Sequence, residues 1–566
     1  MRRYIGLHWL IYPLFLACCA KTTSPTGGPK DTIPPVLIKS IPEKGSIKYD
    51  GKEIQLFFSE NVILKNQKEQ IIVTPDIGKD YKIEANKKTV TIQLEKKLKD
   101  STTYTFSFRD AIGDLNEQNP AQNLKLAFST GDYIDSLSIE GKVSDPLKSK
   151  DLNDITVALY QSDTFDIFKH NAAYLTKSDK KGSFKIENLK PGKYYVYAID
   201  DKSRNLIVDS KSESYGYLSD SIKLTTNLKN VNIPMIRLDA RQLKISSGRP
   251  YNTYFNIKTT KGIQSYTVKS DEVIPYSLTG EDNTSIKIYN TLSEQDSASV
   301  KLNITDSIGN EIDTVLFIKF NKQTTKPEKF DLTTKDFRLI ENKGLLTGTV
   351  KFTKPLFQIN FDSLLYKIDS LNIIKFQKED ITYDTSRAIL YFQKTFNKTL
   401  LQQEEIENPK TTEPKQNKTE SKGKQPPLKK VIENQLYFAK ASFISIESDS
   451  SRKIEESLRP IKLDQTGILF IDIETKEEYF IVQLLAKDFT IIKTEVNKHK
   501  ISFEDLAPSD YMIRLIIDTD KNKKWSQGNY YSKQEPEKVI FYKNEKDVLL
   551  VNLRANFELG PLLIKY

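Results

Sequence analysis

The chain has 566 residues, of which 38% are hydrophobic and 10% aromatic, and it carries a formal net charge of +10. At about 150 residues per domain this length predicts roughly four domains, and the apolar content is enough to fill several small cores. Lysine and arginine alternate with aspartate and glutamate along most of the chain. We therefore expect no basic face concentrated enough to bind nucleic acid.

The cysteines and histidines exclude several kinds of active site. Both cysteines, Cys18 and Cys19, lie at the N-terminus, and the histidines are His8, His170 and His499. The remaining chain therefore offers no disulfide, thiol nucleophile or Cys/His zinc cluster. Neither later histidine lies in a nucleophile elbow, and no phosphate-binding glycine loop is present. We expect a protein that is not an enzyme, and an enzyme with an unrecognised active site is kept as an alternative.

Residues 1–18 have the pattern of a signal peptide. Arg2 and Arg3 precede an apolar run over residues 4–17, which is short for a membrane span. The run ends in Leu16-Ala17-Cys18-Cys19, which resembles a bacterial lipobox, whose cysteine receives a diacylglycerol group. Because leucine then stands three residues before it, Cys19 is the expected lipidation site, with Cys18 as the alternative. An ordinary cleaved signal, or an uncleaved anchor, is the other interpretation.

Residues 19–35 are small, polar and proline-rich, and we expect them to form a flexible tether. From residue 36 onward, short stretches of alternating polar and apolar residues predict β-strands, for example at 54–58, 89–94 and 104–108. Turns rich in Asp, Gly, Asn and Lys separate them at the spacing of a β-sandwich, and convincing long amphipathic helices are absent from the sequence. We assign the first such domain to residues 36–132.

Four motifs carry a family resemblance in this domain, at residues 58–60, 98–104, 110–116 and 128–131. They resemble the bacterial Ig-like domain of the surface-layer type. Together with the leader and the tether, they also resemble a group of Bacteroidetes lipoproteins that begin with this domain. The resemblance implies a β-sandwich that serves as a spacer or binding module, on a lipoprotein of the outer membrane.

The second domain, residues 133–237, contains a strand, a Pro-Gly turn and a further strand over 182–197. This segment resembles the prealbumin-like or carboxypeptidase-regulatory-like module, a small non-catalytic β-sandwich. The pattern returns at 501–511 without a gap, and Glu187 and Tyr194 recur as Glu504 and Tyr511. An ungapped internal match of this length indicates a repeat, so we assign residues 461–566 to a second copy.

Two regions remain between these copies. Residues 238–325 are predicted to form a β-sandwich of uncertain type. Residues 326–460 are assigned to a second Ig-like domain, because segments near 350–355 and 442–449 resemble parts of the first. Within it, residues 402–430 are almost all polar or charged, which predicts a disordered insertion that is either a tolerated loop or a partner-docking tail. The predicted fold class is therefore all-β, with several β-sandwich domains in one chain.

One loop has the spacing of a calcium site. Asp518, Asp520 and Asn522 present oxygen ligands at alternate positions, as calcium loops of the EF-hand type do. Lys523 stands where such loops have glycine, and Asn529 stands where they have a bidentate glutamate. A turn capped by Asp and Asn side chains is therefore the preferred interpretation, with calcium as the alternative and no other cofactor expected.

Trp525, Tyr530 and Tyr531 follow that loop. Such a cluster can stack on sugar rings, although a packing role that anchors the turn is the preferred interpretation. Eight Asp-Ser/Thr-apolar triplets resemble the O-glycosylation site of exported Bacteroidetes proteins, and strand-edge composition accounts for part of them. Their hydroxyl residues are Thr32, Ser136, Ser221, Ser297, Ser307, Thr314, Ser363 and Ser370.

We expect from these features a lipid-anchored envelope protein in the outer membrane, on its periplasmic face or at the cell surface. Its expected role is that of a scaffold or interaction subunit that contacts other envelope proteins. The resemblance implies an accessory component of a large outer-membrane complex, such as one that assembles or exports surface proteins. The alternative from another class is a carbohydrate-binding surface lipoprotein.

Overall fold

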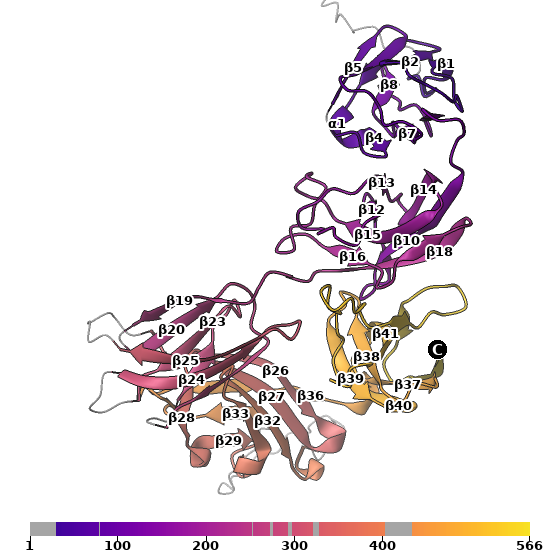
Figure 1. Ribbon diagram of the computed structural model, residues 1–566. Helices are drawn as coiled ribbons and strands as arrows, with labels where there is room; N and C mark the ends of the chain where they lie inside the picture. Colours follow the sequence, from indigo (N-terminus) through magenta and orange to yellow (C-terminus); the bar gives the residue numbers. More distant parts are fainter. Residues whose placement is uncertain are drawn as a thin grey trace, which may run out of the picture. The chain divides into compact units, whose positions relative to one another are not determined.

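The computed structural model describes residues 30–78, 80–251, 253–271, 275–291, 297–320, 328–401 and 433–566 (Figure 1). Strands dominate these residues, which confirms the predicted all-β class; the α-helix among them is the single turn α1 (Gln67–Gln70). Among them, no helix is long and apolar enough to cross a membrane. The predicted signal peptide, most of the tether and the insertion at 402–430 lie outside the described residues.

The chain forms two compact units. The first contains the residues up to Ser138 together with Ala173–Leu175 and Glu187–Lys190, and the second contains the others, from Ile139 to Tyr566.

The first unit contains the predicted Ig-like domain. Its strands are β1 (Leu37–Ile41), β2 (Glu53–Phe58), β3 (Val62–Leu64), β4 (Ile72–Thr74), β5 (Tyr81–Asn86), β6 (Thr89–Leu94), β7 (Thr103–Ser107), β8 (Ile112–Asp114) and β9 (Lys125–Ser129). They form a sheet in the order β1-β2-β6-β5, a sheet in the order β4-β7-β9, and the pair β3-β8. Alternating apolar residues of β2, β6 and β7, among them Ile54, Val90 and Phe106, are fully buried in a common core.

The next nine strands fall within residues 133–237. They are β10 (Leu137–Asp145), β11 (Lys150–Asp151), β12 (Thr156–Tyr160), β13 (Tyr174–Lys177), β14 (Ser183–Leu189), β15 (Gly192–Ile199), β16 (Tyr215–Tyr217), β17 (Ile222–Leu224) and β18 (Leu228–Ile236). Their order is β11-β10-β18-β16-β15-β12-β13, with β14 on β10 and β17 on β15. Strands β10 and β18 are parallel, and the pairs that β15 makes are antiparallel.

Seven strands follow in the region assigned to 238–325. They are β19 (Ile245–Pro250), β20 (Tyr254–Thr259), β21 (Ser265–Lys269), β22 (Ser277–Thr279), β23 (Ser285–Tyr289), β24 (Ser297–Thr305) and β25 (Glu311–Lys319). They form sheets in the orders β19-β20-β23-β22 and β21-β24-β25. Ile257, Ile286 and Leu302 are fully buried together. Beside this core, Lys261 Nζ lies 2.7 Å from a carboxylate oxygen of Asp306, and both side chains are almost completely buried.

The strand order of the first domain returns in the following region. Its strands are β26 (Leu332–Ile340), β27 (Leu345–Phe352), β28 (Leu356–Ile359), β29 (Leu364–Lys367), β30 (Ile373–Lys375), β31 (Ile381–Asp384), β32 (Ile389–Thr395), β33 (Gln435–Phe438), β34 (Phe443–Ser445), β35 (Ile454–Ser457) and β36 (Pro460–Ile461). The order β26-β27-β32-β31 matches β1-β2-β6-β5, the order β29-β33-β35 matches β4-β7-β9, and β28-β34 matches β3-β8. Strands β30 and β36 are additions at the sheet edges.

The last eight strands repeat most of the pairing of β10 and β12–β18. They are β37 (Gly467–Glu474), β38 (Phe480–Ala486), β39 (Ile491–Val496), β40 (Lys500–Leu506), β41 (Ser509–Ile517), β42 (Val539–Phe541), β43 (Val551–Leu553) and β44 (Glu558–Lys565). Strand β41 pairs with β38, β42 and β43 as β15 pairs with β12, β16 and β17, and β37 is parallel to β44 as β10 is to β18. Strand β40 is β14 shifted by 317 residues, from Ser183 to Lys500. The repeat read from 11 residues of sequence therefore extends over most of the pairing scheme, although the pair β16–β18 has no counterpart between the described strands β42 and β44.

Candidate functional site in the loop after strand β41

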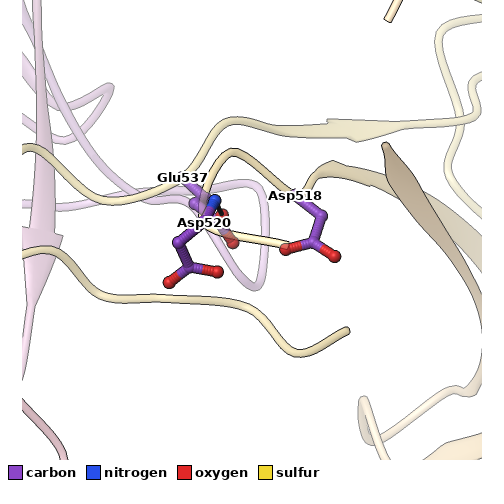
Figure 2. A group of neighbouring side chains, drawn as sticks. All are labelled: Asp518, Asp520 and Glu537. Carbon is purple, nitrogen blue, oxygen red and sulfur yellow. Dashed lines mark hydrogen bonds between the residues drawn. The ribbon is translucent and has the colours of Figure 1, made fainter. Parts of the chain in front are cut away.

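Three carboxylates lie together in the loop that joins β41 to β42. Each of Asp518, Asp520 and Glu537 offers an oxygen atom, and these atoms all lie within 4.8 Å of one another (Figure 2). Strand β41 ends at Ile517 and β42 begins at Val539, so the two strand ends bring Asp518 and Glu537 together. Asp518 and Glu537 are buried and Asp520 is exposed. Oxygen ligands so grouped are of the type that binds Ca²⁺.

The two buried carboxylates, however, already accept hydrogen bonds from the loop backbone. The oxygens of Asp518 accept the N–H groups of Asn522 and Lys523, both at 3.0 Å. One oxygen of Glu537 accepts the N–H of Thr519 at 2.6 Å, and the other accepts that of Ser526 at 2.9 Å. These side chains hold the loop closed by satisfying backbone donors that strand pairing leaves unused.

Asn522, the third predicted calcium ligand, has another role in the structure. Its side-chain N–H group donates to Asp520 at 2.9 Å, and its side-chain oxygen accepts the N–H of Lys524 at 2.7 Å. Glu537 takes the third position of the acidic cluster, 17 residues beyond Asp520. The spacing rule of a contiguous calcium loop could not find it, because the next strand, and not the local sequence, places this residue.

Burial raises the pKa of Glu537 above its usual value, and the hydrogen bonds from Ser526 and Thr519 only partly oppose that effect. The protonated form of Glu537 is therefore favoured in the folded loop relative to the unfolded chain.

The loop of the first copy, after β15, closes in the same way. Asp201 lies 317 residues before Asp518 and also accepts the N–H groups of the residues four and five positions later, at 3.0 Å. Glu213 takes the part of Glu537, since its two oxygens accept the N–H groups of Ser203 and Asp209 at 2.9 Å. The residue at the position of Asp520 is Ser203. The third carboxylate is thus particular to the second copy.

The three aromatic residues of the loop have different environments. Trp525 is half-buried, and its indole N–H donates to the backbone oxygen of Glu537 at 3.0 Å. Tyr531 is 63% exposed, and its hydroxyl donates to the backbone oxygen of Ala240 at 3.1 Å.

Tyr530 packs edge-on against four aromatic rings of the first copy at centroid distances of 5.2–6.5 Å. These are Phe168, Tyr197, Tyr215 and Tyr217. Burial raises the pKa of Tyr530 to about 12. Tyr530 therefore has the packing role that the sequence favoured, and its ring is not available to stack on a ligand.

Trp525 lies in the wall of a cavity of about 720 Å³. Met235, Ile236 and Ile155 supply apolar wall, and charged side chains of both signs surround it. The charged residues are Asp145, Lys150, Asp151, Lys180, Asp200 and Arg237. A concave site with an indole and several polar groups has the composition of a small-ligand pocket.

The remaining predicted site residues lie as follows. Cys18 and Cys19 are outside the described residues, as is Asp296 of the Ser297 triplet. The exposed hydroxyl residues are Thr32, Ser136, Ser307 and Ser370, and the half-buried ones are Ser221, Ser297, Thr314 and Ser363. Their glycosylation stays a prediction.

Two of the exposed hydroxyl residues share a turn geometry. Asp306 and Asp369 are buried, and each accepts the N–H two residues later, at 2.9 and 2.8 Å. The turn therefore presents Ser307 and Ser370 outward.

The two later histidines are both bonded to backbone. His170 Nδ1 accepts the N–H of Asp166 at 2.9 Å, and His499 Nδ1 lies 3.0 Å from the backbone oxygen of Ile473. These backbone contacts fix the orientation of each imidazole ring.

Comparisons with known proteins identify one domain. Residues 31–130 match the family model for a bacterial Ig-like domain. No curated protein matches the chain.

Several solved structures are similar to this chain. The TIE protein of Bacillus anthracis is 9% identical, with 95% of this chain and 75% of that one covered and a TM-score of 0.13. BcpA, the major pilin subunit of Bacillus cereus, is 10% identical, with 76% and 99% covered and a TM-score of 0.12. A glucan-locus protein, SGBP-B of Bacteroides ovatus, is 9% identical, with 63% and 82% covered and a TM-score of 0.16. These scores transfer no function, so what the comparisons show is the bacterial Ig-like domain at residues 31–130.

Proposed function

We propose that the protein is a non-catalytic scaffold of the cell envelope, tethered to the outer membrane by a lipid on Cys19. Its partners would be other envelope proteins, and its place that of an accessory subunit in a large outer-membrane complex for assembly or export of surface proteins. The supporting observation is the duplication of two β-sandwich pairing schemes within one chain. Duplication multiplies sheet edges and surface loops, which are the features that β-proteins use to bind protein partners.

Purification from native membranes in mild detergent, followed by mass spectrometry, tests this proposal. The expected result is stoichiometric recovery of outer-membrane proteins with the tagged chain. Cys19→Ala should move the chain out of the membrane fraction, whereas Cys18→Ala, its matched control, should leave it there. Recovery of the chain alone from wild-type membranes would contradict the scaffold role, and membrane retention of Cys19→Ala would contradict the anchor.

A second candidate function is glycan binding, and the observation that favours it is the position of Trp525 in the cavity wall. Indole faces stack on sugar rings, while carboxylate and lysine groups bind their hydroxyls. A glycan array followed by calorimetry tests this candidate. Trp525→Ala should abolish binding, and Tyr531→Ala, on the same loop outside the cavity lining, should retain it. An array without any bound glycan would reject this candidate.

A further inference from the structure

Strand β25 forms one edge of the sheet β21-β24-β25. It pairs with β24 over all nine of its residues, from Glu311 opposite Thr305 to Lys319 opposite Ser297. Its other edge has no strand partner among the described residues. A long edge strand of this kind presents a row of backbone donors and acceptors that another strand can use.

The hydrogen-bond pattern of the β24–β25 hairpin shows which residues of β25 direct their backbone N–H and C=O groups away from β24. The N–H of Asp306 donates to the backbone oxygen of Asn310 at 3.0 Å, which makes these two a hydrogen-bonded pair. Because such pairs alternate with non-bonded ones in an antiparallel ladder, the even-numbered residues of β25 bond to β24. The backbone groups of Asp313, Val315, Phe317 and Lys319 therefore point away from β24.

The side chains of the same four residues are exposed on the outer face of the sheet. Val315 is 64% and Phe317 73% exposed, which is unusual for two apolar neighbours on one strand. Asp313 precedes them and Lys319 follows them, and both are exposed. The outer face of β25 therefore has the order acidic, apolar, apolar, basic. This order is self-complementary when a second strand runs in the opposite direction.

We propose that β25 pairs with β25 of a second copy of the chain, antiparallel and with a two-fold axis at Leu316. In this register Asp313 lies opposite the second copy's Lys319, and Val315 lies opposite its Phe317. Symmetry makes each of these contacts twice, and the four edge-facing residues fall into hydrogen-bonded pairs. The two three-stranded sheets become one sheet of six strands, and the contact closes on itself, as an isologous dimer requires.

The charge pattern of β25 favours a second copy of this strand as the partner over a strand of unspecified sequence. Opposite charges across a strand pair stabilise it and like charges destabilise it. A parallel copy would place Asp313 on Asp313 and Lys319 on Lys319, whereas the antiparallel copy pairs each charge with its opposite. Asp313 also lies 3.5 Å from Lys301, but both side chains are more than half exposed, so this contact is weak and does not compete.

Sedimentation velocity over a range of concentrations tests the proposal, with the chain from residue 20 onward, which has all the described residues and no cysteine. We expect a monomer–dimer equilibrium. Asp313→Lys places like charges opposite each other twice and should weaken the dimer at least about tenfold. The double change Asp313→Lys with Lys319→Asp restores opposite charges, so it should restore the dimer.

Two further variants test which residues of β25 form the contact and in which register the two strands pair. Phe317→Ser should weaken the dimer by about tenfold or more, because it removes two apolar contacts. Glu311→Lys lies outside the paired segment in this register and should leave the dimer unchanged. A chain that is monomeric at all concentrations, a dimer that tolerates Phe317→Ser, or a double variant without rescue would each overturn the proposal. Capture of a foreign strand on β25 of a monomeric chain would also overturn it.

Discussion

The loops after β15 and β41 differ in length and composition, yet they close by the same hydrogen bonds. In both, an aspartate at the strand end accepts two N–H groups four and five residues later, and a distant glutamate accepts two more. Both loops also have left-handed backbone at matching positions, Arg204 and Leu206 in the first and Lys521 and Lys523 in the second. Closure therefore needs neither glycine nor a third carboxylate.

The difference between the copies shows which residues are free to carry function. Asp518 and Glu537 have counterparts in a loop that has no acidic cluster of this kind among the described residues, so their role is structural. Asp520, Trp525 and Tyr530 have no equivalent residues in the loop of the first copy. Any activity particular to the second copy must depend on these additions.

The largest expected effect comes from removing the aspartate of each loop. Asp518→Ala leaves the N–H of Lys523 without an acceptor and leaves that of Asn522 only its 3.1 Å bond to Asp520. Because Asp518 is 2% exposed, this change should destabilise the loop by about 2–4 kcal/mol. Asp201 is half-buried, so Asp201→Ala should cost about half as much. Hydrogen exchange of the amides at 205–206 and 522–523 measures both. Equal effects, or none, would mean that these carboxylates do not close the loops.

Glu537→Gln should have the next largest effect, and it should depend on pH. One amide oxygen cannot replace two carboxylate oxygens, so the cost near neutral pH is about 1 kcal/mol. Because the pKa of Glu537 is raised in the folded loop, the loop is most stable below the usual glutamate pKa and loses stability as pH rises through the raised value. Denaturation followed by Trp525 fluorescence, in a Trp9→Phe background, should show this slope in the wild type and lose it in the glutamine variant.

An effect of similar size is expected near the ends of the matching strands β14 and β40. Asn188 and Asp505 occupy matching positions with φ of 59° and 56°. At either position the alanine variant should be less stable than the glycine variant by about 1 kcal/mol. Both substitutions remove the side-chain contacts, but only alanine is disfavoured at a positive φ. Comparing alanine with glycine at each site cancels the contacts of the lost side chains. Thermal unfolding of the four variants should give the same difference in both copies.

How far the sequence could predict these features depended on what placed each residue. Alternating apolar residues and the shared spacing from Glu187 to Tyr194 revealed the strands and the repeat, because both are local patterns. The calcium interpretation used the local spacing of Asp518, Asp520 and Asn522, and it missed Glu537, which a different strand places. The free edge of β25 was equally hidden, since strand pairing determines it. Long-range pairing was the part that no local pattern encoded.

The smallest expected effect is that of Asp520→Ser, which gives the second loop the residue of the first. Asp520 is exposed, and its partners Asn522 and Ser526 can bond to water, so the change should alter stability by less than about 0.5 kcal/mol.

Terbium luminescence excited through Trp525 tests whether Asp520 adds a metal site instead. We expect neither a terbium signal nor a change in Trp525 fluorescence on chelation, because every oxygen of the two buried carboxylates accepts a backbone N–H. A saturable terbium signal that Asp520→Ser removes, and that Asn522→Ala retains, would show instead that the added carboxylate turns a closing loop into a cation site.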